Sequence, residues 1–323
     1  ASYMGGISLK YRRLGKTDLK VSVVGFGAWQ FGGEWGKRFT QQEADGLLGR
    51  AKDLGINLID TAECYGDHLS ESLIGQAIKK DRDDWVIATK FGHRFHRNFE
   101  RTDHWSPQEV LQQLEASLKA LRTDFIDLYQ FHSGSDQAFD QDRLWQMLND
   151  QVRAGKVRYL GISISSKRDT LHQTQQATEV GASVVQVVYN RLDREPEQRV
   201  LPSCRAQDLG VLARVPLASG FLSGKYTPGA EFTQKDDIRS LHDNGEVQKR
   251  LKLVQEIQQT EVPNGVAMAP WALAWCLQHP AVTCVIPGCK TVEQLESNAS
   301  AADLDMVRAD HPQVLKLNEE FNA

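Results

Sequence analysis

Eight short apolar runs, separated by helical patterns, constrain the fold of this chain more than any other feature. The runs are 21–26, 57–61, 85–90, 125–132, 157–163, 183–189, 211–217 and 281–287. Short runs rich in Val, Ile and Leu that alternate with helices predict parallel strands joined by helical crossovers. Eight such units in about 290 residues favour an α/β fold of the closed (β/α)₈ (TIM) barrel type over an open doubly wound sheet.

Capping patterns mark three helix starts. Thr40–Glu43 and Ser106–Glu109 each place a hydroxyl three residues before Glu, the pattern of a capping box, and Pro107 suits the first helical position. Thr291 opens a helix after the last run in the same way. These starts support the alternation of strands and helices along the chain.

Residues 7–21 contain two alternating runs around a Gly-Lys-Thr-Asp turn, which predicts a β-hairpin outside the barrel. No linker, low-complexity tract or charge block divides the rest of the chain, so we expect one barrel domain over residues 7–323. Residues 1–6 are interpreted as a disordered start or a remnant of the expression vector.

Composition excludes several classes of function. The net charge of -4 gives no general attraction to nucleic acid or to an anionic membrane, and no apolar run is long enough to cross a bilayer. The five cysteines lack the paired spacing of a zinc site or a disulfide framework. A cytoplasmic location and no bound metal are therefore expected.

Three of the apolar runs end on chemically useful side chains, Asp60, Lys90 and His132, and Tyr65 lies just after the first of them. In a parallel barrel the carboxyl ends of the strands converge, so these groups should meet. An ammonium beside a phenol lowers the phenol's pKa from about 10 toward neutrality, and a carboxylate holds the ammonium. The set is that of a reductase that gives a proton to a carbonyl oxygen.

The chain resembles the aldo-keto reductase family from Tyr11 to about Ala301, and most closely a bacterial branch that also resembles potassium-channel β subunits. The resemblance rests on several motifs in order, among them Asp60-Thr-Ala-Glu-Cys-Tyr-Gly66, Gly155-Lys-Val-Arg-Tyr-Leu-Gly-Ile-Ser163, Pro216-Leu-Ala-Ser-Gly220 and Ile286-Pro-Gly288. It implies a tetrad in which Tyr65 is the general acid, Lys90 tunes it, Asp60 pairs with Lys90, and His132 orients the substrate carbonyl. Gly25-Phe-Gly27 lacks the third glycine of a dinucleotide-binding Rossmann motif.

The resemblance also implies a nicotinamide cofactor. Ser163 and Gln186 match the family's contacts with the carboxamide of the nicotinamide. Ile164 stands where Asn is usual. Another group, such as Asn190, would therefore have to supply the contact that the Asn makes. Arg214 occupies the position of the ring that commonly stacks on the nicotinamide. A guanidinium there would disfavour the oxidised, positively charged ring and bias the enzyme toward reduction.

The resemblance implies contacts for the other parts of the cofactor. The pyrophosphate would lie on Leu217, Ser219, Gly220 and Lys225; the 2′-phosphate on Gly288, Lys290, Thr291 and Gln294; and the adenine edge on Ser297 and Asn298. Gln294 replaces the usual Arg, but no Asp or Glu is expected at the ribose. NADPH is thus favoured, with weaker NADH binding possible.

Two long loops, 91–105 and 219–245, are expected near the pocket, as functional lids or as plain structure. His93 and His96 invite a metal interpretation, but solvated loop residues are favoured. The predicted partner is a small-molecule carbonyl substrate, and monomer and homo-oligomer stay open. Two rival functions are a nucleotide-sensing channel-type subunit with slow incidental turnover and a metal-assisted barrel lyase or hydrolase. The latter would need a carboxylate/His cluster at the strand ends, where only Asp60 and His132 are expected.

Overall fold

The computed structural model describes residues 9–315, so the expected start at residues 1–6 lies outside the described part of the chain. Its strands are β1 (Tyr11–Arg13), β2 (Lys20–Ser22), β3 (Phe26–Gly27), β4 (Leu58–Asp60), β5 (Val86–Phe91), β6 (His93–Arg97), β7 (Glu100–Asp103), β8 (Ile126–His132), β9 (Val157–Ser163), β10 (Ala182–Val188), β11 (Gly210–Arg214) and β12 (Cys284–Val285). Its α-helices are α1 (Gln41–Asp53), α2 (Leu69–Ala77), α3 (Pro107–Leu121), α4 (Asp136–Phe139), α5 (Asp142–Arg153), α6 (Leu171–Gln175), α7 (Val200–Ala206), α8 (Asn244–Thr260), α9 (Met268–Leu277) and α10 (Val292–Ser300).

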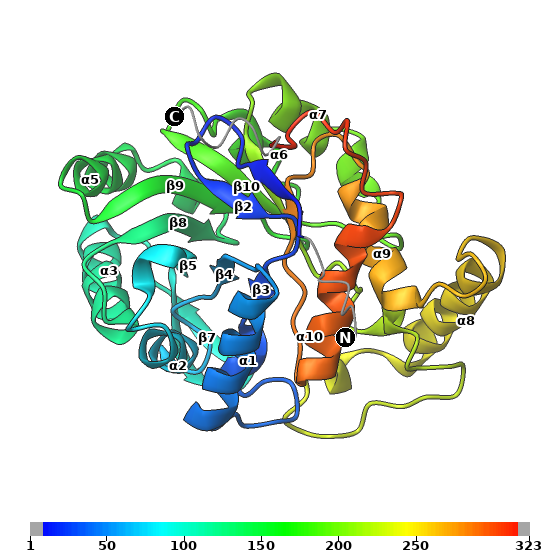
Figure 1. Cartoon of the computed structure of the whole chain (residues 1–323). Helices are drawn as coiled ribbons and strands as arrows, with labels where there is room; N and C mark the ends of the chain where they lie inside the picture. Colours follow the sequence, from blue (N-terminus) through cyan, green and yellow to red (C-terminus); the bar gives the residue numbers. More distant parts are fainter. Residues whose placement is uncertain (1–8, 316–323) are drawn as a thin grey trace, which may run out of the picture.

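Eight parallel strands form the barrel in the order β3-β4-β5-β8-β9-β10-β11-β12. The first and last strands meet, because parallel bridges join Val24 to Val285 and Gly27 to Gly288. The helices that come after these strands, α1 and α10, also lie side by side (Figure 1). The chain therefore has the predicted (β/α)₈ fold.

Both predicted capping boxes are present. The Thr40 and Ser106 hydroxyls accept from the backbone of Glu43 and Glu109, and Pro107 begins α3. Thr291 caps α10 by accepting from the backbone N–H of Gln294. The helix cap alone therefore accounts for Thr at position 291, without the expected contact between its hydroxyl and a cofactor phosphate.

The predicted N-terminal hairpin is confirmed, since β1 pairs antiparallel with β2. Its apolar side chains pack into one buried cluster with inward-facing barrel residues: Leu14, Leu19 and Val21 with Leu58, Leu128, Val184 and Leu212. The hairpin thus fills the end of the barrel opposite the carboxyl ends of the strands. The prediction of a first barrel strand over 21–26 was wrong in its bounds, because residues 20–22 pair with β1 and the barrel strand is Phe26–Gly27.

Other boundaries also differ from prediction, and the strand expected over 281–287 is only Cys284–Val285. The strand expected over 211–217 ends at Arg214, because Val215 adopts a left-handed φ of 53° that turns the chain. The segment 91–105, expected as a loop, contains a second antiparallel hairpin formed by β6 and β7.

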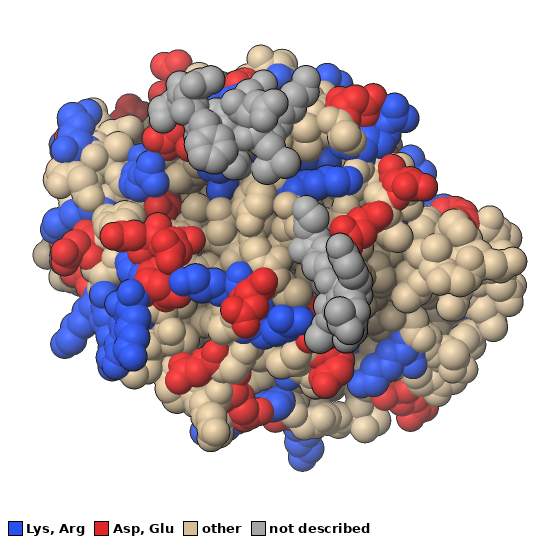
Figure 2. Space-filling model, viewed as in Figure 1, with Lys and Arg blue, Asp and Glu red and all other residues tan. Residues whose placement is uncertain are grey.

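One face of the molecule can be judged for charge in Figure 2. On the face shown in Figure 2, basic and acidic side chains are interspersed. Within residues 9–315, no helix combines the length and the apolar character that a bilayer crossing requires.

Candidate active site

The site begins with the two-residue period of the strands. Leu58, Ala88, Leu128 and Val184 point into the barrel core, and the residues two positions later point inward at the next level. These are Asp60, Lys90, Gln130 and Gln186, all at most 4% exposed. The barrel therefore carries a buried polar layer just below the carboxyl ends of its strands.

Lys90 is the centre of this layer. Its Nζ donates to Asp60 Oδ2 at 2.8 Å, to the Thr61 carbonyl at 2.8 Å and to Tyr65 Oη at 3.2 Å. Burial disfavours its charge, but Asp60 and Tyr65 outweigh burial and hold the pKa of Lys90 above its ordinary value. Lys90 is thus a fixed cation beside the Tyr65 phenol.

The second oxygen of Asp60 is also occupied. Asp60 Oδ1 accepts from Gln130 Nε2 at 3.1 Å and from Gln186 Nε2 at 2.8 Å. Gln186 also donates to Gln130 Oε1 at 2.9 Å. The Gln186 amide nitrogen, expected to contact the cofactor carboxamide, therefore supports Asp60, and Gln130 is a supporting residue that sequence reasoning missed.

Tyr65 corrects one expectation about electrostatics. Lys90 lowers the pKa of Tyr65 as predicted, but burial of the phenol outweighs this effect, so the pKa of Tyr65 is raised above 10. The phenol consequently keeps its proton across the neutral range. Trp29 stacks on the Tyr65 ring, with centroids 6.1 Å apart and an interplanar angle of 21°.

His132 ends β8 and lies beside Tyr65, their ring centroids 6.3 Å apart in an edge-on arrangement. Burial, with the charges of His93, Lys90, Arg101 and Arg214, holds the pKa of His132 well below its ordinary value. Its imidazole is therefore neutral near pH 7. The four side chains of the expected tetrad are thus adjacent at one end of the barrel.

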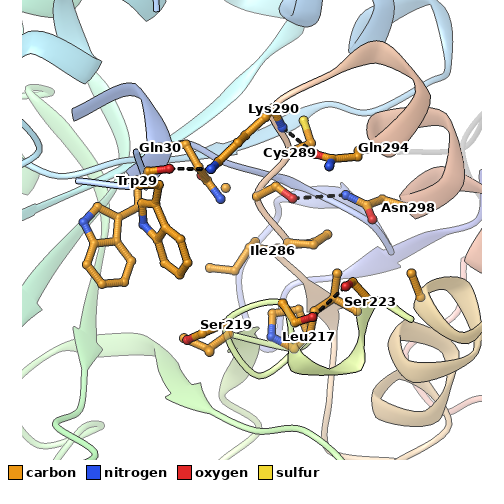
Figure 3. A pocket seen from close by; sticks show the side chains of 18 of the residues that line it. Trp29, Gln30, Leu217, Ser219, Ser223, Ile286, Cys289, Lys290, Gln294 and Asn298 are labelled. Atoms are coloured by element: carbon orange, nitrogen blue, oxygen red, sulfur yellow. Dashed lines mark hydrogen bonds between the residues drawn. The ribbon is translucent and has the colours of Figure 1, made fainter. Parts of the chain in front are cut away.

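A cavity of about 440 Å³ opens above this layer. It lies between the segment after β3, which carries Trp29 and Gln30, the segment after β11 and the segment between β12 and α10 (Figure 3). Eleven of the thirteen expected cofactor residues line it: Gln186, Arg214, Leu217, Ser219, Gly220, Lys225, Gly288, Lys290, Gln294, Ser297 and Asn298. Ser163, at the end of β9, and Thr291 are not part of the lining.

Several buried polar atoms in and beside this cavity lack a hydrogen-bond partner within residues 9–315. They are Ser163 Oγ, Gln30 Oε1, Trp35 Nε1 and Arg214 Nε. Because a buried polar atom without a partner costs free energy, these atoms fit a site that is completed by a polar ligand. Ser163, Trp35 and Arg214 can donate to such a ligand, and Gln30 Oε1 can accept from it.

Arg214 is turned into the cavity and does not pair with a carboxylate in the described chain. Its Nη2 donates to the Ile164 carbonyl at 3.2 Å. Asn190, considered as a substitute for the missing Asn, instead donates to Asp193 and to the Val215 carbonyl and so stabilises a turn. Val215, Ala218 and Ser219 all have left-handed φ angles, a strained backbone of the kind that collects at binding sites.

The 219–245 segment crosses the cavity mouth to the segment after β3. Gly36 N–H donates to the Asp236 carbonyl at 3.1 Å, and Ile238 N–H donates to the Glu34 carbonyl at 2.8 Å. Arg239 lines the cavity, paired with Asp237 at 2.7 Å and 5.4 Å from the Trp35 ring. Arg239 and Gln30 were missed, because nothing in the local sequence distinguishes them from ordinary loop residues.

The end of the cavity beside α10 carries mixed charge. Lys290 Nζ donates to the Trp35 carbonyl, and burial together with Arg239 lowers the pKa of Lys290. Glu293, which sequence reasoning did not consider, lines the same cavity.

Above Tyr65, the β6–β7 hairpin places Arg101 in the site. Arg101 Nη1 lies 3.0 Å from Cys64 Sγ, and Nη2 lies 3.8 Å from Glu34 Oε1. Glu63, Cys64 and His132 bring one polar atom each within 4.8 Å of one another. The expectation that only Asp60 and His132 supply such groups at the strand ends was therefore wrong. Arg101 donates to the Cys64 sulfur and Glu63 contacts His132, so hydrogen bonds already occupy these groups.

Comparisons with known proteins agree with this geometry. The sequence model of the Aldo/keto reductase family matches residues 23–319. A probable voltage-gated potassium channel subunit beta of Arabidopsis thaliana is 31% identical, covering 92% of each chain, and the NADH-specific methylglyoxal reductase of Escherichia coli is 30% identical, covering 92% of this chain and 94% of its own. Among solved structures, the aldo-keto reductase AKR11C1 of Bacillus halodurans in its holo form superposes with a TM-score of 0.77 at 30% identity, covering 92% of each chain.

Proposed function

The chain belongs to the aldo/keto reductase family and is an NAD(P)H-dependent oxidoreductase, and from this premise we propose that it reduces aldehydes and ketones with NADPH, using Tyr65 as the proton donor. The observation that carries the proposal is the Asp60–Lys90–Tyr65 chain of contacts, 2.8 Å and 3.2 Å long, at the floor of the cavity.

Tyr65 suits the role of general acid. Its raised pKa keeps the phenol protonated at neutral pH, so a proton is available at its Oη. As that proton leaves, negative charge develops 3.2 Å from the Lys90 ammonium, whose position Asp60 fixes. A preorganised charge of this kind stabilises the transition state without reorganisation. His132, beside Tyr65, holds the substrate carbonyl, and the bound cofactor supplies the hydride.

The cavity supports a nicotinamide dinucleotide as the ligand. Ser163 Oγ has no partner within residues 9–315, and Gln186 Oε1 can accept from a carboxamide while its Nε2 remains on Asp60. At the opposite end, Gly288 accommodates Gln30, since a Cβ at that position would lie 1.5 Å from Gln30 Nε2. These two ends are the ones expected for the nicotinamide and the adenosine.

We favour NADPH over NADH because the lining of the whole cavity carries more cations than carboxylates: Arg214, Lys225, Arg239 and Lys290 against Asp60 and Glu293. Arg239 is close enough to Lys290 to lower the pKa of Lys290, and Glu293 is exposed. Glu293 is nevertheless the side chain that would assist an NADH enzyme, and the E. coli relative is named as NADH-specific. Fluorescence titration with both cofactors decides between them.

The function is tested by binding followed by turnover. We expect quenching of tryptophan fluorescence by NADPH at lower concentrations than by NADH, then oxidation of NADPH with a panel of simple aldehydes. Tight NADPH binding with turnover much slower than about 1 s⁻¹ across the panel would favour instead a nucleotide-sensing subunit, the rival that the plant channel relative suggests. The five cysteines, all buried and unpaired, support a cytoplasmic location.

A further inference from the structure

A second buried contact lies behind the proposed site. Glu63, in the loop between β4 and α2, places Oε1 3.3 Å from His132 Nδ1. Glu63 is 2% exposed and His132 is 8% exposed. Nδ1 also lies 3.8 Å from Cys64 Sγ, a longer and weaker contact than the one with Glu63. Because Nδ1 faces these two groups, the other ring nitrogen, Nε2, is the one left for a substrate carbonyl.

The carboxyl group of Glu63 is only partly satisfied. Its second oxygen, Oε2, is buried and has no hydrogen-bond partner within residues 9–315. An oxygen atom in that state costs free energy unless it carries or receives a hydrogen. A proton held on the Glu63 carboxyl would reduce this cost.

Proton counting then limits what His132 can do. A neutral imidazole has one N–H, so it donates from one nitrogen and accepts at the other. If Glu63 is ionised, His132 donates from Nδ1 to Glu63, and Nε2 has only a lone pair, which repels a carbonyl oxygen. If Glu63 carries a proton, it donates to Nδ1, and Nε2–H can donate to the carbonyl.

We propose that Glu63 and His132 share one titratable proton, and that only the protonated pair orients a carbonyl substrate for reduction. The inference rests on the proposed function, because it concerns the same carbonyl. Glu63 acts through His132 and is thus a positioning residue. The unprotonated pair, with an acceptor at Nε2, suits the hydroxyl of the alcohol product, so the pair links the direction of the reaction to pH.

The pair is enclosed by other ionisable side chains. They are Cys64, Tyr65 and His68 between β4 and α2, Lys90 on β5, His93 on β6, Arg101 on β7, Tyr129 on β8, Arg214 on β11 and Glu34 in the segment after β3. Burial raises the pKa of Cys64 well above its ordinary value, so that thiol is neutral. The surrounding cations disfavour a charged imidazole, so the pair does not hold its proton as an imidazolium.

The expected pH dependence has a definite sign. Reduction should be constant below the apparent pKa of the pair and fall about tenfold for each further pH unit. Alcohol oxidation should rise over the same interval. Because the pKa of Tyr65 lies above 10, a fall in reduction that begins below about pH 9 does not come from Tyr65.

Glu63→Gln is the decisive variant. The amide has nearly the shape of the carboxyl group, and it can donate to Nδ1 or accept from it without a titrating proton. Benzaldehyde reduction and benzyl alcohol oxidation, measured as kcat/KM from about pH 5 to pH 10, should therefore each vary less than about threefold in this variant below pH 9. Glu63→Leu, which can neither donate nor accept, should lower reduction at every pH, so that the Gln variant restores activity relative to it.

Glu34→Gln is the matched control. It removes another buried carboxyl group, 1% exposed, that contacts Arg101 but makes no hydrogen bond to His132. The pH step should remain in this variant, displaced along the pH axis. In ¹⁵N-histidine spectra, the signal that His132→Asn removes should change between tautomers over the same pH interval in the wild type and stay constant in Glu63→Gln.

Three results would overturn the proposal: a flat wild-type profile, an unchanged step in Glu63→Gln, or a His132 signal that does not respond to Glu63. These results count against the proposal only when the wild-type enzyme reduces benzaldehyde or binds NADPH. A wild type that neither binds NADPH nor reduces any aldehyde would instead contradict the proposed function, so the two failures are distinguishable.

Discussion

Arg214 donates a hydrogen bond from Nη2 to the carbonyl oxygen of Ile164, 3.2 Å away. These are the two positions where the sequence departs most clearly from the pattern of its family. The hydrogen bond joins these two positions. Arg214 stands where the resemblance leads us to expect a ring that stacks on the nicotinamide. It holds the backbone of Ile164, which stands where the resemblance leads us to expect Asn. Arg214 Nε remains without a partner within residues 9–315, which leaves a donor directed at the cavity.

Replacing Arg214 by Tyr should change the preference between oxidised and reduced cofactor. Two like charges about 4 Å apart cost several kcal/mol at an effective dielectric of 20, reduced here by nearby Asp60. Arg214→Tyr should therefore tighten NADP⁺ binding relative to NADPH by at least about tenfold. Both dissociation constants are measured at one ionic strength, since salt screens the charge. An unchanged affinity ratio would show that Arg214 does not sense the charge of the ring.

Lys290→Met should weaken NADPH binding about tenfold to a hundredfold and NADH binding much less. A charge-assisted contact with the 2′-phosphate contributes about 1.5–3 kcal/mol, and NADH lacks that phosphate. Lys225→Met is the control, because Lys225 lines the part of the cavity proposed for the pyrophosphate, which both cofactors share. Isothermal titration calorimetry of both variants gives the dissociation constants for NADPH and NADH. Equal losses in Lys290→Met would place the phosphate elsewhere.

Arg12→Met should lower the free energy of unfolding by at least about 2 kcal/mol. Arg12 is completely buried, and its guanidinium donates to the carbonyls of Leu277, Val282 and Thr283. Burial lowers the pKa of Arg12 to about 10, but its charge persists at neutral pH.

The neighbouring Arg13 is the control for Arg12. It forms an exposed pair with Asp208, so Arg13→Met should cost at most about 1 kcal/mol. Urea unfolding of both variants makes the comparison. Equal losses in the two variants would mean that the buried guanidinium of Arg12 contributes no more to the free energy of unfolding than the exposed one of Arg13.

His68 should make stability depend on pH. Its Nδ1 lies 2.5 Å from Glu71 Oε1, and although burial opposes the charge, Glu71 raises the pKa of His68 above its unfolded value. The charged pair therefore stabilises the fold fully below about pH 6.5, and the contribution is lost as the pH rises through the folded pKa. His68→Asn, which tolerates the left-handed φ of 65° at this position, should be most destabilised at low pH. A destabilisation in urea that grows with pH would contradict this.

The sequence predicted the barrel and the placement of the tetrad because both depend on periodicity. Inward side chains recur every two residues, so Asp60, Lys90 and His132 at the ends of apolar strands had to converge. Gln130 obeys the same period and could have been found by it, two residues after Leu128 and two before His132.

The remaining features depend on contacts between distant segments. Arg239 reaches the cavity because the 219–245 segment pairs with the backbone of residues 34–36, and no local pattern encodes that pairing. The raised pKa of Tyr65 depends on the extent of burial, whereas the sequence indicated only its neighbour Lys90. Glu63 was overlooked because its role appears only when the loop before α2 is seen against the end of β8.

The most direct test of the account is single-turnover reduction of an aldehyde by NADPH in the wild type and in Tyr65→Phe. The substitution removes only the hydroxyl that lies 3.2 Å from Lys90 and retains the ring that packs against Trp29. We predict that the rate of cofactor oxidation falls by at least about 10²-fold while the dissociation constant for NADPH changes little. A variant that retains most of the wild-type rate would contradict the assignment of Tyr65 as the proton donor.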